Sequence, residues 1–253
     1  MRTTLDPAGR ECLSFTVSGP WAHFRRIDTT TEKLTYRVIP RTTVAGLLAA
    51  VLGKPRDSYY RTFSPEASAI AITPTSSLTT MAIPQLTLPT EEGDIQTADG
   101  VSGKTVVDPE TIATERKRRT FEYVVDPSYR VDVIFDDTTV FENLHDMMSN
   151  GRSTYTPYLG KSECLATIED VQRTEVLTAD DSSVVDSIAP EEHVVPTPGE
   201  QLRMERTPAY MRADEGGRQT TGFVSYAFAG GDDQVSVSDA PTYAVDGRTV
   251  YFI

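Results

Sequence analysis

The chain has 253 residues, enough to bury a sizeable core as one elaborated domain or two small ones, and its net charge of −13 by itself argues against nucleic acid. No apolar run approaches the roughly 18 residues of a transmembrane helix, and residues 1–15 lack the apolar core of a signal peptide. We therefore expect a cytoplasmic protein without a membrane partner. Cys12 and Cys164 show no zinc-type spacing, which favours two buried thiols.

The make-up of the charge is unusual. Only 5 of the 24 basic residues are Lys, and they stand against 37 acids. Abundant carboxylates and few lysines are typical of proteins in a salt-saturated cytoplasm, where repulsion is screened over a few Å. We infer a halophilic archaeal source, with an ordinary acidic mesophilic protein as the alternative.

The N-terminal part predicts a strand, a turn and a helix. Residues 11–18 alternate as a half-buried strand does, and Ser18-Gly19-Pro20 favours a turn. After the aromatic and basic residues 21–26, Pro40 precedes a helix that we expect to begin with Thr42 or Thr43 as N-cap and to end at Gly53.

The middle and C-terminal parts predict further strands and one more helix. We expect strands at 67–73 and 77–88, a long excursion at 90–109, and a hairpin of 120–125 with 129–135. Thr139 and Glu142 fit a capping box at the start of a helix that Gly151 closes. A strand at 163–171, an acidic polar stretch at 172–200 and a strand-rich tail follow.

This order predicts an α+β fold with a ferredoxin-like βαββαβ core and an inserted β-hairpin at about 77–119. The core domain would span 1–171, and an acidic linker with a β-rich extension would span 172–253. Sheets of this kind leave one face free of helices, and we expect RNA to lie there.

The sequence lacks the residues that several kinds of nucleotide, metal and catalytic site require. Gly160-Lys161-Ser162 does not form a phosphate-binding loop, because Tyr155 stands where the earlier Gly is required. The three histidines are scattered, so we expect no metal and no cofactor, and no nucleophile elbow is present. His23 could be a general base, a stacking partner or a polar core residue.

What remains is the chemistry of RNA binding. Residues 19–61 hold eight bases against three acids, a local basic patch that indicates a partner or neutralises acids elsewhere in the fold. Aromatic rings stack on bases, and Arg binds phosphate through two hydrogen bonds. Trp21 and Phe24 could instead be core residues, and Lys161 and Ser162 could form an ordinary turn. The candidate RNA-binding residues are Trp21, His23, Phe24, Arg25, Arg26, Tyr36, Arg41, Thr42, Thr43, Lys117, Arg118, Arg119, Lys161 and Ser162.

Two segments resemble a known family. Gly19-Pro20-x-Ala22-x-Phe24-Arg25, followed by Ile39-Pro40-Arg41-Thr42-Thr43-Val44-x-Gly46-Leu47-Leu48, resembles the N-terminal signature of CRISPR-associated protein family five. Tyr158-Leu159-Gly160-Lys161-Ser162-Glu163-Cys164 is similar to its later loop motif. Direct matching covers about 50 residues, the order of elements extends it to about residue 171, and the composition suggests type I-B.

The resemblance implies a RAMP-superfamily subunit of the Cascade complex for antiviral defence. Such subunits cap the backbone filament, hold the 5′ handle of the CRISPR RNA with a hairpin thumb, and contact the large subunit near the target DNA. The segment 77–119 would be the thumb. One branch of the family cleaves precursor RNA with Tyr, Lys and His. Lys117 and Tyr59 or Tyr60 would match two of these residues, but no His neighbours Lys117, and the nearest later one is His145. We expect a non-catalytic binder, with a metal-independent endoribonuclease as the alternative.

Overall fold

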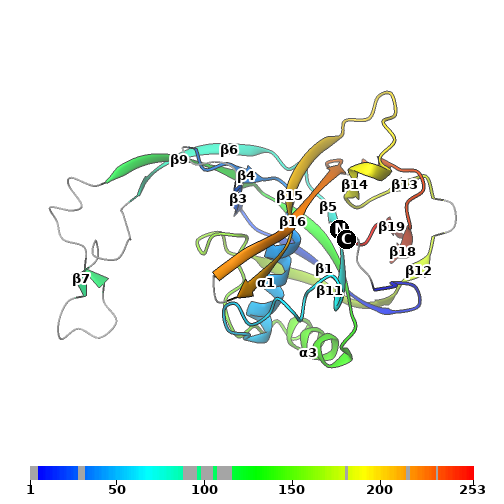
Figure 1. Cartoon of the computed structure of the whole chain (residues 1–253), viewed down its shortest axis with the longest axis horizontal. Coiled ribbons are helices and arrows are strands. Elements are labelled where there is room, and N and C mark those ends of the chain that lie inside the picture. Colours follow the sequence, from blue (N-terminus) through cyan, green and yellow to red (C-terminus); the bar gives the residue numbers. More distant parts are fainter. Residues whose placement is uncertain are drawn as a thin grey trace.

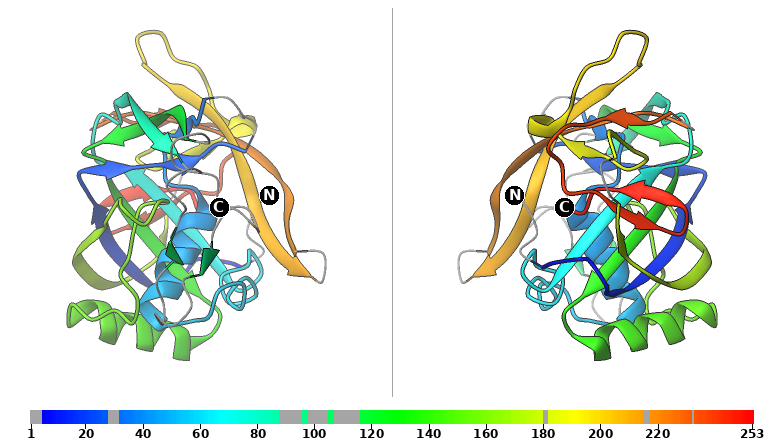
Figure 2. Two further views of the ribbon diagram at one scale, coloured as in Figure 1. Left: turned by 90° about the vertical axis from the view of Figure 1, so that its left-hand side faces the viewer. Right: turned by 90° about the vertical axis from the view of Figure 1, so that its right-hand side faces the viewer.

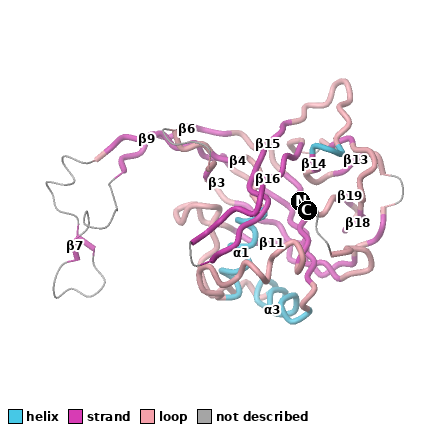
Figure 3. The backbone as a smooth tube through the Cα atoms, viewed as in Figure 1, coloured by secondary structure: helices cyan, strands magenta, loops and turns pink. Residues whose placement is uncertain are grey.

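The computed structural model describes residues 5–27, 32–87, 96–97, 105–106, 116–179, 182–214, 217–231 and 233–253. Within these ranges the protein is rich in strands, with two α-helices and several small sheets around one larger sheet (Figure 1). Figure 3 shows how strongly strands outweigh helices. No helix in the described part of the chain is long and apolar enough to cross a membrane.

A four-stranded sheet forms the centre of the fold. Its strands, in spatial order, are β11 (Thr167–Glu175), β1 (Glu11–Ser18), β10 (Ser128–Phe135) and β5 (Ser68–Pro74). All neighbours pair antiparallel. The two inner strands, β1 and β10, are the first and third of the four along the chain. Alternation in β1 places Leu13 and Phe15 in the main core and Cys12 on the opposite face.

The last strand of this sheet lies further along the chain than predicted. The sequence predicts a strand at 163–171, whereas β11 begins at Thr167 and continues to Glu175. It therefore runs past residue 171, where we placed the domain boundary. The division of the chain at that residue stays a prediction.

Two helices, α1 (Arg41–Leu52) and α3 (Thr138–Ser149), pack on one face of the sheet (Figure 1). The predicted N-caps are wrong in both. Pro40 is the N-cap of α1, and its carbonyl accepts from the N–H groups of Thr43 and Val44. Asp137 caps α3 by accepting from Thr139 N–H at 2.8 Å, which replaces the predicted capping box. Gly53 ends α1 in the left-handed conformation, as predicted.

The opposite face of the sheet is covered, so the expectation that it lies open to RNA is wrong. A hairpin of β18 (Tyr243–Val245) and β19 (Arg248–Val250) packs there, with Val245 and Val250 in an apolar cluster with Cys12. The backbone of Ile253 exchanges two hydrogen bonds with that of Ile70, at 2.9 and 3.2 Å, at the β5 edge. The C-terminal part of the chain thus completes the core.

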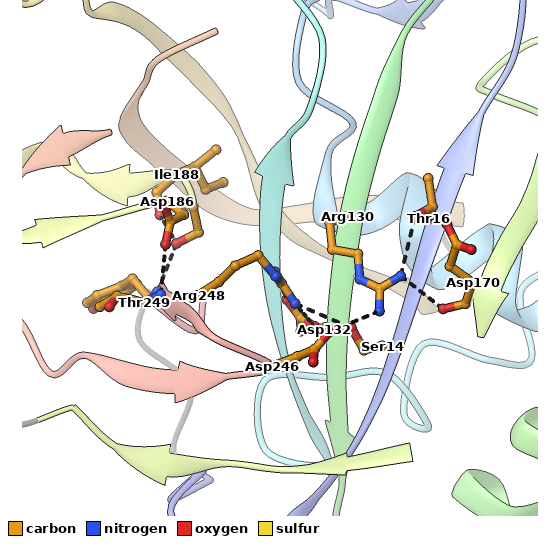
Figure 4. A network of polar contacts seen from close by, with 12 residues as sticks. Ser14, Thr16, Arg130, Asp132, Asp170, Asp186, Ile188, Asp246, Arg248 and Thr249 are labelled. Atoms are coloured by element: carbon orange, nitrogen blue, oxygen red, sulfur yellow. Dashed lines mark hydrogen bonds and ion pairs between the residues drawn. The ribbon is translucent and has the colours of Figure 1, made fainter. Parts of the chain in front are cut away.

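A polar network lies within this covered face (Figure 4). The Asp132 side chain is fully buried and accepts from Arg248 at 2.7 and 2.8 Å and from the Ser14 hydroxyl at 2.5 Å. Beside it, Arg130 donates to the Asp170 carbonyl at 2.9 Å. Buried charges are tolerated only with such partners, so these arginines belong to the fold.

A long hairpin of β6 (Thr80–Thr87) and β9 (Lys117–Val125) projects from the body (Figure 1). It follows β5 and precedes β10 in the chain, which is where the sequence places an inserted hairpin. Beyond its strands only β7 (Gln96–Thr97) and β8 (Thr105–Val106), which pair with each other, are described. The rest of the predicted excursion at 90–109 lies outside the described residues.

The predicted pairing of 120–125 with 129–135 is wrong. β9 pairs with β6 on one side and with β2 (Trp21–Ala22) on the other, whereas β10 lies in the central sheet. Asp126, with φ of 45°, and Pro127 turn the chain from one sheet into the other. A tight turn between two strands therefore marks a change of sheet here.

The C-terminal region adds a ribbon and several small sheets. β15 (Arg203–Asp214) and β16 (Gly217–Phe228) form the ribbon along the side of the body (Figure 2), and β14 (Ala189–Pro190) extends it. The Glu205 carboxylate accepts from the N–H groups of Arg37 and Val38, which ties the ribbon to the segment before α1. The remaining elements are β3 (Phe24–Arg25) with β4 (Thr35–Tyr36), β12 (Leu177–Thr178) with β18, β13 (Val184–Val185) with β17 (Val235–Ser236), and a 3-10 turn at Glu191–His193.

Candidate nucleic-acid interface

The two segments that carry the family resemblance lie against each other. His23 N–H donates to the Leu159 carbonyl at 3.1 Å. A Cβ on Gly160 would lie 2.1 Å from the His23 carbonyl oxygen, and the φ of Gly160 is +89°. Gly19 also allows a close approach of two backbones, because a Cβ there would lie 2.6 Å from the Leu165 carbonyl oxygen. Glycine is required at both positions because the two backbones approach so closely.

Aromatic and basic side chains gather where these segments meet β9. Phe121 and Tyr123 point to one face of β9, because they are two residues apart. Lys161 Nζ lies 4.2 Å from the Phe121 ring centroid and 2.9 Å from the Tyr123 hydroxyl. The Trp21 ring meets Tyr123 edge-on at 6.2 Å. We call Trp21, Phe121, Tyr123 and Lys161 the aromatic–basic face.

Lys161 is fixed in this face by several partners. Its ammonium group forms an ion pair with Glu163 at 2.5 Å and donates to Gln85 at 3.3 Å. Trp21 and Phe121 are half-buried and still present ring surface, whereas Tyr123 is buried beneath them. The face therefore offers rigid rings and a positioned cation, which suits an unstacked base beside a phosphate.

His23 supports the face from below. It is 2% exposed, and its Nδ1 lies 2.7 Å from the Glu122 carbonyl oxygen. Burial lowers the pKa of its imidazole, so the neutral form is favoured. Its ring contacts those of both Phe121 and Tyr123, with centroid distances of 5.5 and 5.4 Å. Of the three roles the sequence allows, these contacts favour the polar core residue.

Cations line the edge of the aromatic–basic face. Arg25 is exposed at the end of β3, and the backbone of Lys33 forms an isolated β-bridge with that of Phe121 in β9. Desolvation and then the charges of Arg25 and Arg119 lower the pKa of the Lys33 ammonium. We call Arg25, Lys33 and Arg119 the cation rim. Like charges held this close favour an anionic ligand.

The other predicted cations near this edge differ in their surroundings. Arg26 is half-buried, with its guanidinium carbon 5.6 Å from the centroid of the Tyr36 ring. Lys117 and Arg118 are exposed at the outer end of β9. They extend the positive charge along the projecting hairpin.

Besides His23, three predicted residues are buried, so their side chains are not exposed to RNA. Phe24 is 2% exposed and packs on Tyr129, and Tyr36 is 3% exposed. Arg41 is 4% exposed and donates to the carbonyl groups of Ile253, Phe63 and Ser68. Burial lowers its pKa to about 10, so it remains charged at neutral pH. All three residues stabilise the fold.

The remaining predicted residues lie around a neighbouring cavity and loop. Thr42 and Thr43 line a cavity of about 250 Å³ beside α1, and Gly160 lines its other side. Ser162 is exposed in the loop next to Lys161. This cavity is separate from the aromatic–basic face, and the loop at 158–162 lies between them.

The candidate nuclease residues are not brought together. Tyr59 and Tyr60 follow α1, Lys117 is on the projecting hairpin, and His145 stacks on Phe141 in α3 (Figure 1). Another set of the same three residue types does meet, namely Tyr123, Lys161 and His23. Its histidine is buried, as described above.

Phe121 and Tyr123 were not singled out from the sequence. Both continue the basic run at every second position after Lys117 and Arg119, on the same side of the strand. That alternation is a strand pattern with a cationic end and an aromatic end. If residues 117–125 are interpreted as one strand, this pattern predicts that Phe121 and Tyr123 lie on the same side as Lys117 and Arg119.

Comparisons with known proteins point to one group. The family model described as CRISPR-associated protein (Cas_Cas5) matches residues 12–241. The fold is similar to that of a CRISPR protein from Archaeoglobus fulgidus, with a TM-score of 0.56 and 14% identity over 95% of this chain and 98% of that chain. It is also similar to a chain of a CRISPR RNA-guided surveillance complex, with a TM-score of 0.54 and 15% identity over 89% and 90% of the two chains. No curated protein sequence matches the chain.

Proposed function

Since the chain belongs to the Cas5 family of CRISPR-associated proteins, we propose that it is a non-catalytic Cascade subunit that binds the 5′ handle of the CRISPR RNA. The observation that carries the proposal is Lys161 held 4.2 Å from the Phe121 ring, with Trp21 and the cation rim beside it. Rings and cations at this spacing suit single-stranded RNA, whose bases stack while its phosphates meet cations.

The projecting β6–β9 hairpin has the place of a thumb in this proposal. It extends the aromatic–basic face away from the body, and its outer end carries Lys117 and Arg118. RNA would pass along the hairpin and across the loop at 158–162. The covered face of the central sheet would not contact it.

We further propose a fold class, a source and a set of partners for the protein. The antiparallel sheet with its two inner strands and two helices on one face supports a ferredoxin-like RAMP core. Few lysines among many acids support a haloarchaeal, type I-B protein in the cytoplasm. The partners would be the backbone-filament subunit and the large subunit, with target DNA contacted indirectly, in antiviral defence.

Purification of the tagged full-length chain from its host at high salt tests the proposal. We expect CRISPR RNA and other Cascade subunits to co-purify, and Trp21→Leu with Arg25→Gln to lower the retained RNA at least tenfold. Tyr155→Leu with Arg152→Gln is the matched control, because it changes an exposed ring and an exposed guanidinium beside the helices. Wild-type RNA retention by the first variant would place the site elsewhere, and protein partners without RNA would indicate a protein-only scaffold.

A metal-independent endoribonuclease is the alternative, and the meeting of Tyr123, Lys161 and His23 is the observation that favours it. The buried imidazole and the ion-paired ammonium argue for binding, since neither is free to exchange protons with a substrate. Incubating the chain with precursor repeat RNA in chelator separates the two proposals. A discrete cut that Lys161→Met abolishes would establish the enzyme.

A further inference from the structure

The cavity beside α1 is bounded by a helix on one side and by tyrosines on the other. Its volume is about 250 Å³, and its helical wall includes Gly46 and Ala50. A Cβ on Gly46 would have only the Tyr59 hydroxyl within 4 Å, at 3.4 Å. The cavity therefore exists because small residues occupy this side of α1.

Aromatic rings form the opposite wall. Tyr59 and Tyr60 have ring centroids 4.8 Å apart, and both rings are half-buried. Tyr158 is 43% exposed and lines the cavity from the loop at 158–162. Tyrosine supplies a flat apolar surface and a hydroxyl at its rim, which together suit a planar heterocycle.

Polar contacts hold this wall in place before any ligand binds. Asp57 accepts from the Tyr60 hydroxyl at 2.9 Å and from Arg218 Nε at 2.7 Å. The Tyr210 hydroxyl donates to the Tyr60 carbonyl at 2.9 Å. Through these bonds the tip of the β15–β16 ribbon is joined to the segment after α1. Such preorganisation lowers the entropic cost of binding.

The cavity also has hydrogen-bonding groups and a positive charge at its rim. Thr42, Thr43 and Arg218 are among the residues that line it, and they carry two hydroxyls and a guanidinium. Its volume is below the roughly 300–1,000 Å³ of pockets that bury drug-sized ligands. A single heterocycle with several donors and acceptors fits these features better than a larger molecule or an aliphatic side chain.

The cavity lies next to the aromatic–basic face. Tyr158 and Gly160 line the cavity, and Lys161, the next residue, lies over Phe121 in the face. RNA crossing the face is therefore one short loop away from the cavity. A base turned out of the strand at this point would enter it.

We propose that the cavity between α1 and the β15–β16 tip holds one unstacked RNA base, and this rests on the proposed function of RNA binding. The base stacks on the tyrosine wall, its edge meets the threonine and tyrosine hydroxyls, and Arg218 approaches the adjoining phosphate. One nucleotide of the bound RNA is thereby held apart from its neighbours.

The test scans a 12-nucleotide single-stranded RNA from the host CRISPR repeat, with one abasic site at each position in turn. Binding to the full-length chain is measured by fluorescence anisotropy. Wild-type protein should lose about tenfold in affinity at one cavity-specific position. Gly46→Leu, which fills the cavity, should bind unmodified RNA about tenfold more weakly and show no further loss at that position. Gly46→Ala is the control, since it adds one methyl group to the helix and leaves most of the cavity open.

The outcomes separate the two proposals. If wild-type protein does not bind this RNA or the RNA purified with its complex, the proposed function fails. If RNA binds and Gly46→Leu leaves every abasic penalty unchanged, the base cavity is wrong and RNA binding stands. Tyr158→Ala repeats the comparison with a half-exposed side chain, so a folding defect of Gly46→Leu cannot decide the result.

Discussion

Two regions of the molecule contain arginine residues, and the arginines of the two regions differ in what they contact. On the covered face of the central sheet, Arg248 is bound to a buried carboxylate and Arg130 to a backbone carbonyl. At the cation rim, Arg25 and Arg119 form no ion pair within the described part of the chain. The same residue type thus stabilises the fold in one region and remains available to a ligand in the other. The contacts of each arginine side chain, more than its exposure or its position in the sequence, distinguish a structural arginine from one that can bind a ligand.

Removal of the buried carboxylate should have the largest effect on stability. We expect Asp132→Ala to lower the free energy of unfolding by about 3–5 kcal/mol, because Arg248 is left uncompensated in the interior. Urea unfolding at constant salt measures the change. Asp146→Ala on α3, whose carboxylate is 63% exposed in its pair with Arg152, should cost less than about 1 kcal/mol. Equal effects of the two changes would contradict the assignment of Asp132 to the core.

Removing a ring from the aromatic–basic face should affect RNA binding more than stability. We expect Phe121→Leu to weaken RNA binding by about 1–3 kcal/mol, since one stacking surface is removed, and to change the unfolding free energy less. Anisotropy with labelled repeat RNA gives the first quantity, and urea unfolding gives the second. Unchanged affinity with a large loss of stability would show that Phe121 is a core residue like Phe24.

The salt dependence of RNA binding should distinguish the cation rim from arginines that are already paired. Removing one cation that neutralises a phosphate of single-stranded RNA should reduce the slope of log K against log salt by about 0.7. We expect this for Arg25→Gln and for Arg119→Gln, and no change for Arg152→Gln, which is paired with Asp146. Titrations at several salt concentrations measure the slope. A slope that does not respond to the rim variants would remove them from the RNA path.

The smallest effect concerns the hydrogen bond that holds the cavity wall. The Arg218 hydrogen bond holds the pKa of the Asp57 carboxyl below its ordinary value of 3.8. Because the folded-state pKa is below the unfolded one, this bond stabilises the fold above pH 3.8, and its stabilisation disappears as the pH falls through the lowered value. An NMR titration of the carboxyl should show this midpoint. Arg218→Gln should raise it part of the way back, because the Tyr60 hydroxyl still donates.

Local features of the fold could be predicted from the sequence. The strand at Glu11–Ser18 and the helix that Gly53 ends follow from alternation, apolar spacing and a left-handed glycine. These signals act between neighbours in the chain. Pairing between distant segments was harder to predict. The turn at Asp126-Pro127 has the composition of a hairpin, yet the strands on either side pair with other partners.

The candidate site was only partly predictable for the same reason. Trp21, Arg25 and Lys161, which lie in the candidate site, stand in segments with a recognisable sequence pattern. Phe24, Tyr36 and Arg41 stand in the same segments and are buried, since the surfaces that cover them come from distant parts of the chain. Nothing near Arg41 indicates that Ile253 will accept its hydrogen bond. Residue type gives the chemistry, and long-range packing decides whether that chemistry is exposed.

The hydrogen bond from Arg41 to Ile253 also has a consequence for synthesis on the ribosome. Its two residues are 212 positions apart in the chain. At about 5–20 residues per second, the second residue is made roughly 10 to 40 s after the first. Asp132 is likewise made 116 positions before Arg248. Until Val245 and Val250 are made, the face of the nascent sheet that they cover lacks their side chains, and Cys12 lacks its apolar cover. The order of translation thus leaves this face of the nascent sheet exposed to aggregation until residues 243–253 have been made.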